Sequence, residues 1–190
     1  MKFIVFLIVF VIGFVAASFS QTARYELRME NPANHYFQVD LYLKDYKSKE
    51  IEVKLPVWAP GSYLVREFSK NLNQVRATDE NGNPLQVIKK TKNAWIIKRE
   101  KAKEVKVSYE VYAFELTVRT SFLDLTHGFV SGTGVFMYTE ETRNKPGQLK
   151  IIPHASFSKI STALPEVGEG VVNDGKAKEF SFENYDILVD

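Results

Sequence analysis

The protein is a chain of 190 residues in which 25 Lys and Arg residues nearly balance 23 Asp and Glu residues. The net charge of +2 is too small to favour nucleic acid or an anionic membrane as the main partner. The sequence contains no Cys, which excludes disulfides, thiolate-bound metals and thiol catalysis, and its 45% hydrophobic content is typical of a folded protein.

The first 20 residues have the form of a secretory signal peptide. One basic residue, Lys2, precedes an uncharged apolar run over residues 3–19, and small residues allow cleavage after Ala17 or Ser20. The alternative is an uncleaved membrane anchor, because about 17 apolar residues is the lower limit for a span. We therefore expect an exported protein, periplasmic or secreted, with a mature domain over residues 21–190.

The segments that follow alternate apolar and polar residues, which is typical of half-buried antiparallel strands. In chain order, strands are predicted over residues 35–43, 51–55, 74–78, 85–91, 94–99, 105–113, 149–152 and 178–182. Leu116 and Val118 continue the alternation one register later, which predicts a bulge or bend near Phe114.

Turn residues separate these strands. Asn81-Gly82 predicts a hairpin turn, and further turns are expected at residues 145–147 and 173–175. Residues 62–73 could form one or two helical turns with Ser62 as the cap. The sequence thus predicts an all-β domain, an antiparallel β-sandwich or a curved saddle-like sheet, with at most one short helical segment.

Two segments differ from ordinary strand sequence, and the first is the loop after residue 55. Its candidate site residues are Trp58, Pro60, Gly61, Ser62, Tyr63 and Arg66. Trp58 and Tyr63 have ring faces for stacking, and Arg66 can hold a carboxylate through two hydrogen bonds. The alternative is a rigid structural corner in which Trp58 fills the core.

The second segment covers residues 119–135. Its candidate site residues are Asp124, His127, Gly128 and Gly132. Glycines spaced along a strand indicate close approach by another backbone or by a partner, so this segment is either a contact surface or a bulged edge strand.

The sequence contains no recognisable catalytic motif. The three His residues, His35, His127 and His154, are far apart, and neither HExxH nor GxSxG is present. A metal site would have to be assembled from all three histidines across separate strands. We predict no catalytic residue, no metal ligand and no cofactor in this chain.

Several motifs, in order, resemble one family. Residues 55–68 resemble the pattern P-x-W-x-P-G-S-Y-x-x-R-x-[FY] near the start of the glycyl aminopeptidases, the zinc metallopeptidases of peptidase family M61. Residues 105–120 resemble that family's Y-x-V-Y-A-x-[ED]-L-[ST]-V-R-T. Similar matches follow at Leu123-Asp124, His127–Phe129, Gly132, 161–164 and 184–190, so that the resemblance spans about residues 22–190.

The resemblance implies a non-catalytic N-terminal domain of a zinc aminopeptidase, a hydrolase. Family members continue into a catalytic domain with a zinc-binding HExxH helix, and this chain ends at Asp190, where that domain would begin. The expected role is to pack on the catalytic domain and wall the peptide-substrate cleft, with zinc held by that domain and this chain inactive alone.

Two other functions remain as alternatives. One is a free-standing secreted β-sandwich that binds peptide or glycan through Trp58 and Tyr63. The other is an enzyme in its own right, for which the sequence offers no nucleophile or metal motif.

Overall fold

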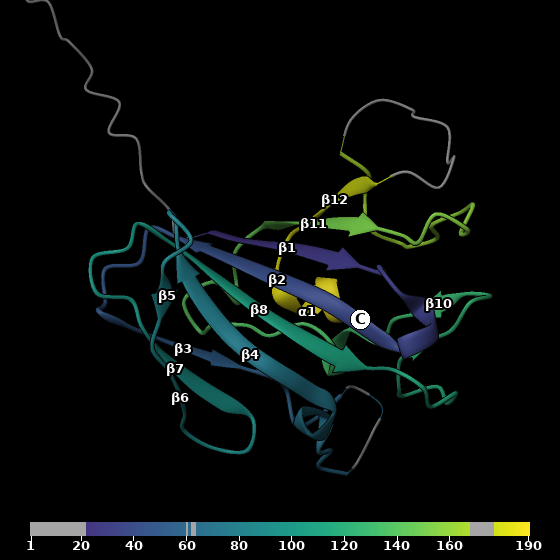
Figure 1. Cartoon of the computed structure of the whole chain (residues 1–190), viewed down its shortest axis with the longest axis horizontal. Coiled ribbons are helices and arrows are strands. Elements are labelled where there is room, and N and C mark those ends of the chain that lie inside the picture. The colour runs from purple at the N-terminus through teal and green to yellow at the C-terminus, as the bar shows by residue number, and fades with distance from the viewer. Residues whose placement is uncertain (1–21, 60, 62–63, 168–176) are drawn as a thin grey trace, which may run out of the picture.

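The structure is a computed structural model, and it describes residues 22–59, 61, 64–167 and 177–190 (Figure 1). The described strands are β1 (Thr22–Arg28), β2 (Tyr36–Lys44), β3 (Glu50–Lys54), β4 (Leu72–Asp79), β5 (Pro84–Leu85), β6 (Val87–Lys89), β7 (Ala94–Lys98), β8 (Glu104–Tyr112), β9 (Phe122–Leu123), β10 (Gly128–Phe129), β11 (Gly147–Ile152) and β12 (Lys178–Phe182). The helices in the same residues are the 3₁₀ helices η1 (Pro32–Asn34), η2 (Phe68–Asn71) and η3 (Gly132–Gly134) and the α-helix α1 (Tyr185–Val189). None of these helices is long and apolar enough to cross a membrane.

The strands form a sandwich-like, mostly β domain. A seven-stranded sheet has the order β12-β11-β1-β2-β8-β4-β5, a three-stranded sheet has the order β3-β7-β6, and β9 pairs with β10 (Figure 1). Alternate residues of the two larger sheets point into one shared core, as Leu41 on β2 and Ile97 on β7 do, and both side chains are fully buried. The predicted period of two is therefore confirmed, with one face of each sheet inside.

The seven-stranded sheet is mixed rather than purely antiparallel. β1 pairs with β11 in parallel, with Tyr25 opposite Leu149, while the other pairs in this sheet are antiparallel. The side-chain period is two in both kinds of ladder, so the sequence pattern could not distinguish them.

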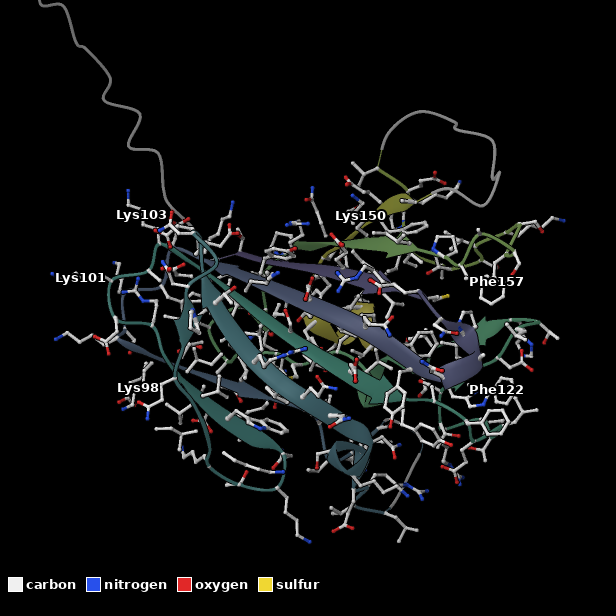
Figure 2. All side chains as sticks on the ribbon, viewed as in Figure 1. Lys98, Lys101, Lys103, Phe122, Lys150 and Phe157 are labelled. Carbon is white, nitrogen blue, oxygen red and sulfur yellow. The ribbon has the colours of Figure 1, made fainter. Side chains whose placement is uncertain are left out.

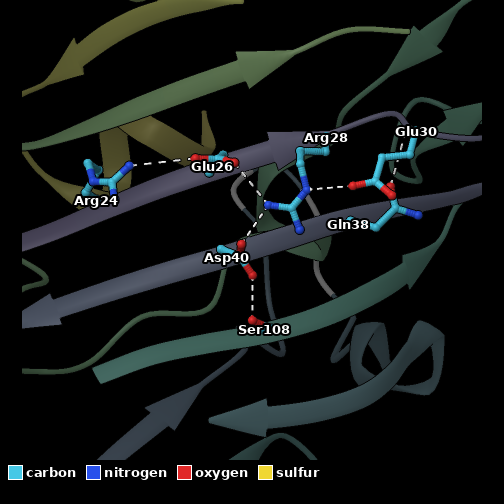
Figure 3. Close-up of polar contacts among 7 residues, drawn as sticks. All are labelled: Arg24, Glu26, Arg28, Glu30, Gln38, Asp40 and Ser108. Atoms are coloured by element: carbon cyan, nitrogen blue, oxygen red, sulfur yellow. Dashed lines mark hydrogen bonds and ion pairs between the residues drawn. The ribbon is translucent and has the colours of Figure 1, made fainter. Parts of the chain in front are cut away.

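Polar side chains of β1, β2 and β8 contact one another on the outer face of the seven-stranded sheet (Figure 3). The Nη1 atom of Arg28 on β1 lies 2.6 Å from the Oδ2 atom of Asp40 on β2. The Ser108 hydroxyl donates a hydrogen bond to the Oδ1 atom of the same carboxylate at 2.5 Å. Burial opposes the positive charge of Arg28, but the hydrogen bond and charge of Asp40 outweigh this and raise the pKa of Arg28. Asp40 is itself buried, so Arg28 and Ser108 supply the partners that a buried carboxylate requires.

Three other predictions from the sequence can be compared with the structure. The hairpin turn at Asn81-Gly82 is confirmed: Gly82 has a φ of +84°, and Asp79 accepts hydrogen bonds from the Asn81 and Asn83 amides. The helical turns predicted over residues 62–73 are a four-residue 3₁₀ helix, η2, and β4 begins directly after it. The predicted leader, the Ser62 cap and the turn at residues 173–175 lie outside the described residues.

The predicted continuation of β8 through Leu116 and Val118 is wrong. These side chains are 71% and 87% exposed, and the strand ends at Tyr112. β2 begins at Tyr36, directly opposite Tyr112, so the chain beyond this point has no β2 residue with which to pair.

A cluster of buried tyrosine hydroxyls holds a non-strand segment inside the core. Residues 135–137 are almost fully buried, and their three consecutive carbonyl oxygens accept hydrogen bonds from tyrosines on β8, α1 and β1. The bonds run from Tyr109 to Val135 (2.9 Å), from Tyr185 to Phe136 (2.6 Å) and from Tyr25 to Met137 (2.6 Å). We call this arrangement the tyrosine clasp, and it satisfies backbone groups that no neighbouring strand pairs.

We expect Tyr109→Phe to lower the free energy of unfolding by about 2 kcal/mol, since it leaves two buried backbone groups without a partner. The Tyr109 hydroxyl both donates to the Val135 carbonyl and accepts from the Met137 amide. Urea unfolding measures the change, with Tyr112→Phe, at an exposed position, as the matched control. Equal stability of the two variants would contradict the role of the clasp.

Alkaline pH should destabilise the fold. Burial raises the pKa of Tyr46 to about 12 and raises the pKa of the three clasp tyrosines as well. Tyrosine in the unfolded chain ionises near pH 10, so the stabilisation is complete below about pH 10 and is lost as the pH rises toward 12. Urea unfolding at pH 8, 10 and 11 should show this fall, and Tyr46→Phe should reduce it. A free energy of unfolding that stays constant up to pH 11 would overturn the expectation.

Candidate functional site

The first predicted loop is exposed at its apolar positions. Trp58 is 51% exposed, so it does not fill the core, and Leu64 and Val65 are more exposed still. The Arg66 amide donates a hydrogen bond to the Val57 carbonyl at 2.6 Å, which brings the two ends of the loop together. Gly61 has a φ of +74°, a conformation that favours glycine.

The other predicted residues of this loop, Pro60, Ser62 and Tyr63, lie outside the described residues. Arg66 lines a cavity of about 240 Å³ together with Glu115, Arg119 and residues of η2. This cavity places the first loop beside the start of the second segment, so the two regions that the sequence singled out are neighbours.

The second segment contains a tight polar turn. One carboxylate oxygen of Asp124 accepts hydrogen bonds from the Thr126 hydroxyl (2.6 Å), the Thr126 amide (2.7 Å) and the His127 amide (3.0 Å). The Thr126 hydrogen bonds, followed by the contributions of His127, lower the pKa of Asp124. Asp124 therefore shapes the loop that presents His127, whose side chain is 55% exposed.

A column of stacked rings connects this turn to His35, which directly precedes β2. The ring centroids are 5.1 Å apart for His127 and Phe122, 5.3 Å for Phe122 and Phe114, and 3.7 Å for Phe114 and His35. Phe122 lies at the edge of the molecule in Figure 2. The His35 Nδ1 atom is 2.6 Å from the Leu123 carbonyl oxygen, so Nδ1 is the donor in that hydrogen bond.

Sequence reasoning missed this aromatic column. His35 and Phe114 belong to distant parts of the chain, and alternation along a strand does not show which rings will meet across strands. The one available signal was the concentration of aromatic residues near the end of the predicted strand over residues 105–113.

The predicted glycine-spaced strand is partly wrong. β10 contains only Gly128 and Phe129, and Gly132–Gly134 form the 3₁₀ helix η3. The predicted close approach is nevertheless confirmed, since a Cβ atom on Gly132 would lie 2.6 Å from the Cα atom of Val189 in α1. The approaching backbone is the chain's own C-terminal helix.

A cavity of about 510 Å³ adjoins this segment. Three of the predicted site residues, His127, Gly128 and Gly132, line it, whereas Trp58 and Arg66 do not. Pro153 and residues 156–164 line it as well, and none of them was predicted as part of a site. The predicted site residues therefore fall into two groups: those of the exposed first loop, and those of the second segment that line this cavity.

The described residues do not provide a zinc site. No group of three or more His, Asp or Glu side chains that could hold a metal ion occurs among them. Two phenyl rings stand between His35 and His127 in the aromatic column, which keeps these imidazoles apart.

Comparison with known proteins identifies the family. The Peptidase M61 N-terminal domain matches residues 24–190, and the chain therefore belongs to this family. The chain is also similar to the crystal structure of an aminopeptidase N family protein from Idiomarina loihiensis, with 33% sequence identity and a TM-score of 0.80. That match covers 89% of this chain but 28% of the Idiomarina chain, so this protein spans less than a third of its structural relative. Among curated proteins, no match was found.

We expect Gly132→Ala to destabilise the protein by about 1–3 kcal/mol, because the new Cβ atom would overlap the Val189 backbone. Gly134→Ala is the matched control: its Cβ atom would lie 3.5 Å from the Phe68 ring, an ordinary contact. Urea unfolding of both variants measures the difference. If Gly132→Ala is no less stable than Gly134→Ala, the packing of η3 on α1 is looser than described.

Proposed function

We propose that this chain is the non-catalytic N-terminal domain of an exported zinc aminopeptidase. In this proposal the domain packs on a catalytic metallopeptidase domain, which supplies the zinc, and it forms one wall of the cleft that holds the peptide substrate. The apolar residues 3–19 support export, to the periplasm or outside the cell.

The observation that supports this proposal best is where the exposed apolar side chains lie. Ten of the 13 exposed large hydrophobic residues in the described chain fall in residues 57–65 and 112–129. They are Val57, Trp58, Leu64, Val65, Tyr112, Phe114, Leu116, Val118, Leu125 and Phe129. Exposed apolar surface of this kind typically marks a protein or ligand contact.

The position of the C-terminus also favours the second segment as part of the contact surface. Asp190 lines the 510 Å³ cavity together with His127 and Gly128, so a domain attached after Asp190 would start beside the second segment. On the outer face of β1 and β2, by contrast, Arg28 is paired with the carboxylates of Glu26 and Asp40 (Figure 3).

A second candidate function is a free-standing secreted domain that binds peptide or glycan. The 51% exposure of Trp58 and the 48% exposure of Phe114 favour it, since exposed rings are the usual platform for sugars and peptides. It differs from the first proposal in requiring no catalytic domain.

A chimaera tests the first proposal. Residues 22–190 would replace the matching segment of the Idiomarina loihiensis protein, and hydrolysis of glycine p-nitroanilide would be measured. We expect an active, zinc-dependent chimaera in which Trp58→Ala lowers kcat/KM about tenfold, a loss of about 1.4 kcal/mol. Ile88→Ala, at an exposed apolar position on β6, is the control and should have no effect.

Two results would count against the proposal. An inactive but folded chimaera would show that this domain does not serve that catalytic domain. An active chimaera whose turnover and thermal stability are both unaffected by Trp58→Ala would remove the first loop from the contact surface.

A further inference from the structure

The short strand β10 has an unpaired backbone edge. In the β9–β10 hairpin, Gly128 lies opposite Leu123, and in the next pair along, the Asp124 amide donates to the His127 carbonyl at 3.0 Å. Hydrogen-bonded and non-bonded pairs alternate in an antiparallel hairpin, so Gly128 and Leu123 form a non-bonded pair. Consistent with this, the Leu123 amide donates in the opposite direction, to the Ala113 carbonyl at 2.7 Å.

By the same alternation, the N–H and C=O groups of Gly128 point away from β9. No hydrogen bond from another element reaches either group among the described residues. Gly128 is exposed and also lines the 510 Å³ cavity. One donor and one acceptor on the same residue, facing outward, are what an added β-strand requires.

The cavity beside this edge has an apolar floor, while polar side chains, including three serines and two threonines, make up much of the rest of its lining. Its floor includes Leu27 and Leu149 from the inner face of the seven-stranded sheet and Leu188 from α1. Most of the remaining lining comes from residues 153–164, which contain no helix or strand and which we call the strap. Phe157 and Ile160 of the strap are half-buried against the core, and Figure 2 shows Phe157 at the same end of the molecule as Phe122.

The size and charge of the cavity restrict its occupant. A volume of about 510 Å³ lies within the range of small-ligand sites and exceeds that of one large apolar side chain. The charged or titratable residues that line it are Lys159, His127 and Asp190. With one lysine and one carboxylate, the lining has little net charge, which matches a neutral main chain and an apolar side chain better than a phosphate or another strong anion.

We propose that β10 and this cavity bind an extended peptide. The peptide main chain pairs with the N–H and C=O groups of Gly128, and one apolar side chain, such as that of Leu or Phe, enters the cavity under the strap. This inference rests on the proposed function for its ligand class, and it adds the strand that holds the peptide and the side chain that is selected.

Binding of short peptides to the isotopically labelled chain tests the inference. The probes are N-acetylated, C-amidated pentapeptides of sequence Gly-Gly-Xaa-Gly-Gly, with Leu, Phe or Asp at the centre. We expect saturable NMR shifts of the Gly128 amide, and a Kd at least tenfold lower for Leu and Phe than for Asp. Equal affinity for the three peptides, or shifts that do not include Gly128, would overturn the inference.

Two variants on the strap separate the cavity from the rest of the surface. Ser161→Phe places a ring at an exposed position that lines the cavity and should weaken binding of the Leu peptide tenfold or more. Ala155→Phe, exposed on the same strap but not part of the cavity lining, should leave the Kd unchanged. If Ser161→Phe does not fold, Ser158→Phe replaces it. Undiminished binding by the cavity-filling variant would contradict the proposed pocket.

The outcomes for this site and for the proposed function can be told apart. If the chimaera is active but peptide binding does not depend on the cavity, the proposed peptide site is refuted and the domain assignment stands. If peptide binding depends on the cavity but the chimaera is inactive, the proposed peptide site stands. That result would favour a free-standing binding domain.

Discussion

Three hydrogen bonds from buried tyrosine hydroxyls to the consecutive carbonyl groups of residues 135–137 organise this domain. A segment without strand partners would leave polar backbone groups unsatisfied in an apolar core, at a cost of about 1–3 kcal/mol for each group. The tyrosine clasp removes that cost and allows the chain to pass through the core between β10 and β11. Its donors come from β1, β8 and α1, so the clasp also connects the seven-stranded sheet to the C-terminal helix.

The clasp fixes the parts that surround the candidate site. η3 lies immediately before the clasped segment, and Gly132 packs against the backbone of Val189. Gly134 meets the ring of Phe68 in η2, which follows the first loop. Consequently one short buried segment and the η3 helix before it position three parts of the surface. These are the exposed apolar loop around Trp58, the hairpin that contains Gly128, and the C-terminus. The buried clasp tyrosines therefore help to position the contact surface that we propose, although they are not part of it.

The sequence predicts most of the strands but few of the contacts between them. Alternation identifies which side of β2 or β8 is buried because burial of one face is a local property. It does not identify partners, so the parallel pairing of β1 with β11 and the stacking of His35 on Phe114 became evident only in three dimensions. Gly132 shows both the strength and the limit of such reasoning. Because glycine has no side chain, its position correctly predicted that another part of the backbone would approach closely. The sequence did not predict that this backbone would be helix α1.

We propose that the exposed apolar residues within 57–65 and 112–129 form the surface that meets the catalytic domain. Hydrogen–deuterium exchange tests it directly, by comparing the chain alone with the same residues inside the chimaera with the Idiomarina loihiensis protein. We expect slower exchange in these two segments within the chimaera, and little change on the outer face around Arg28 and Asp40. Slower exchange confined to that outer face, with the two segments unchanged, would show that the catalytic domain contacts the outer face of the sheet instead.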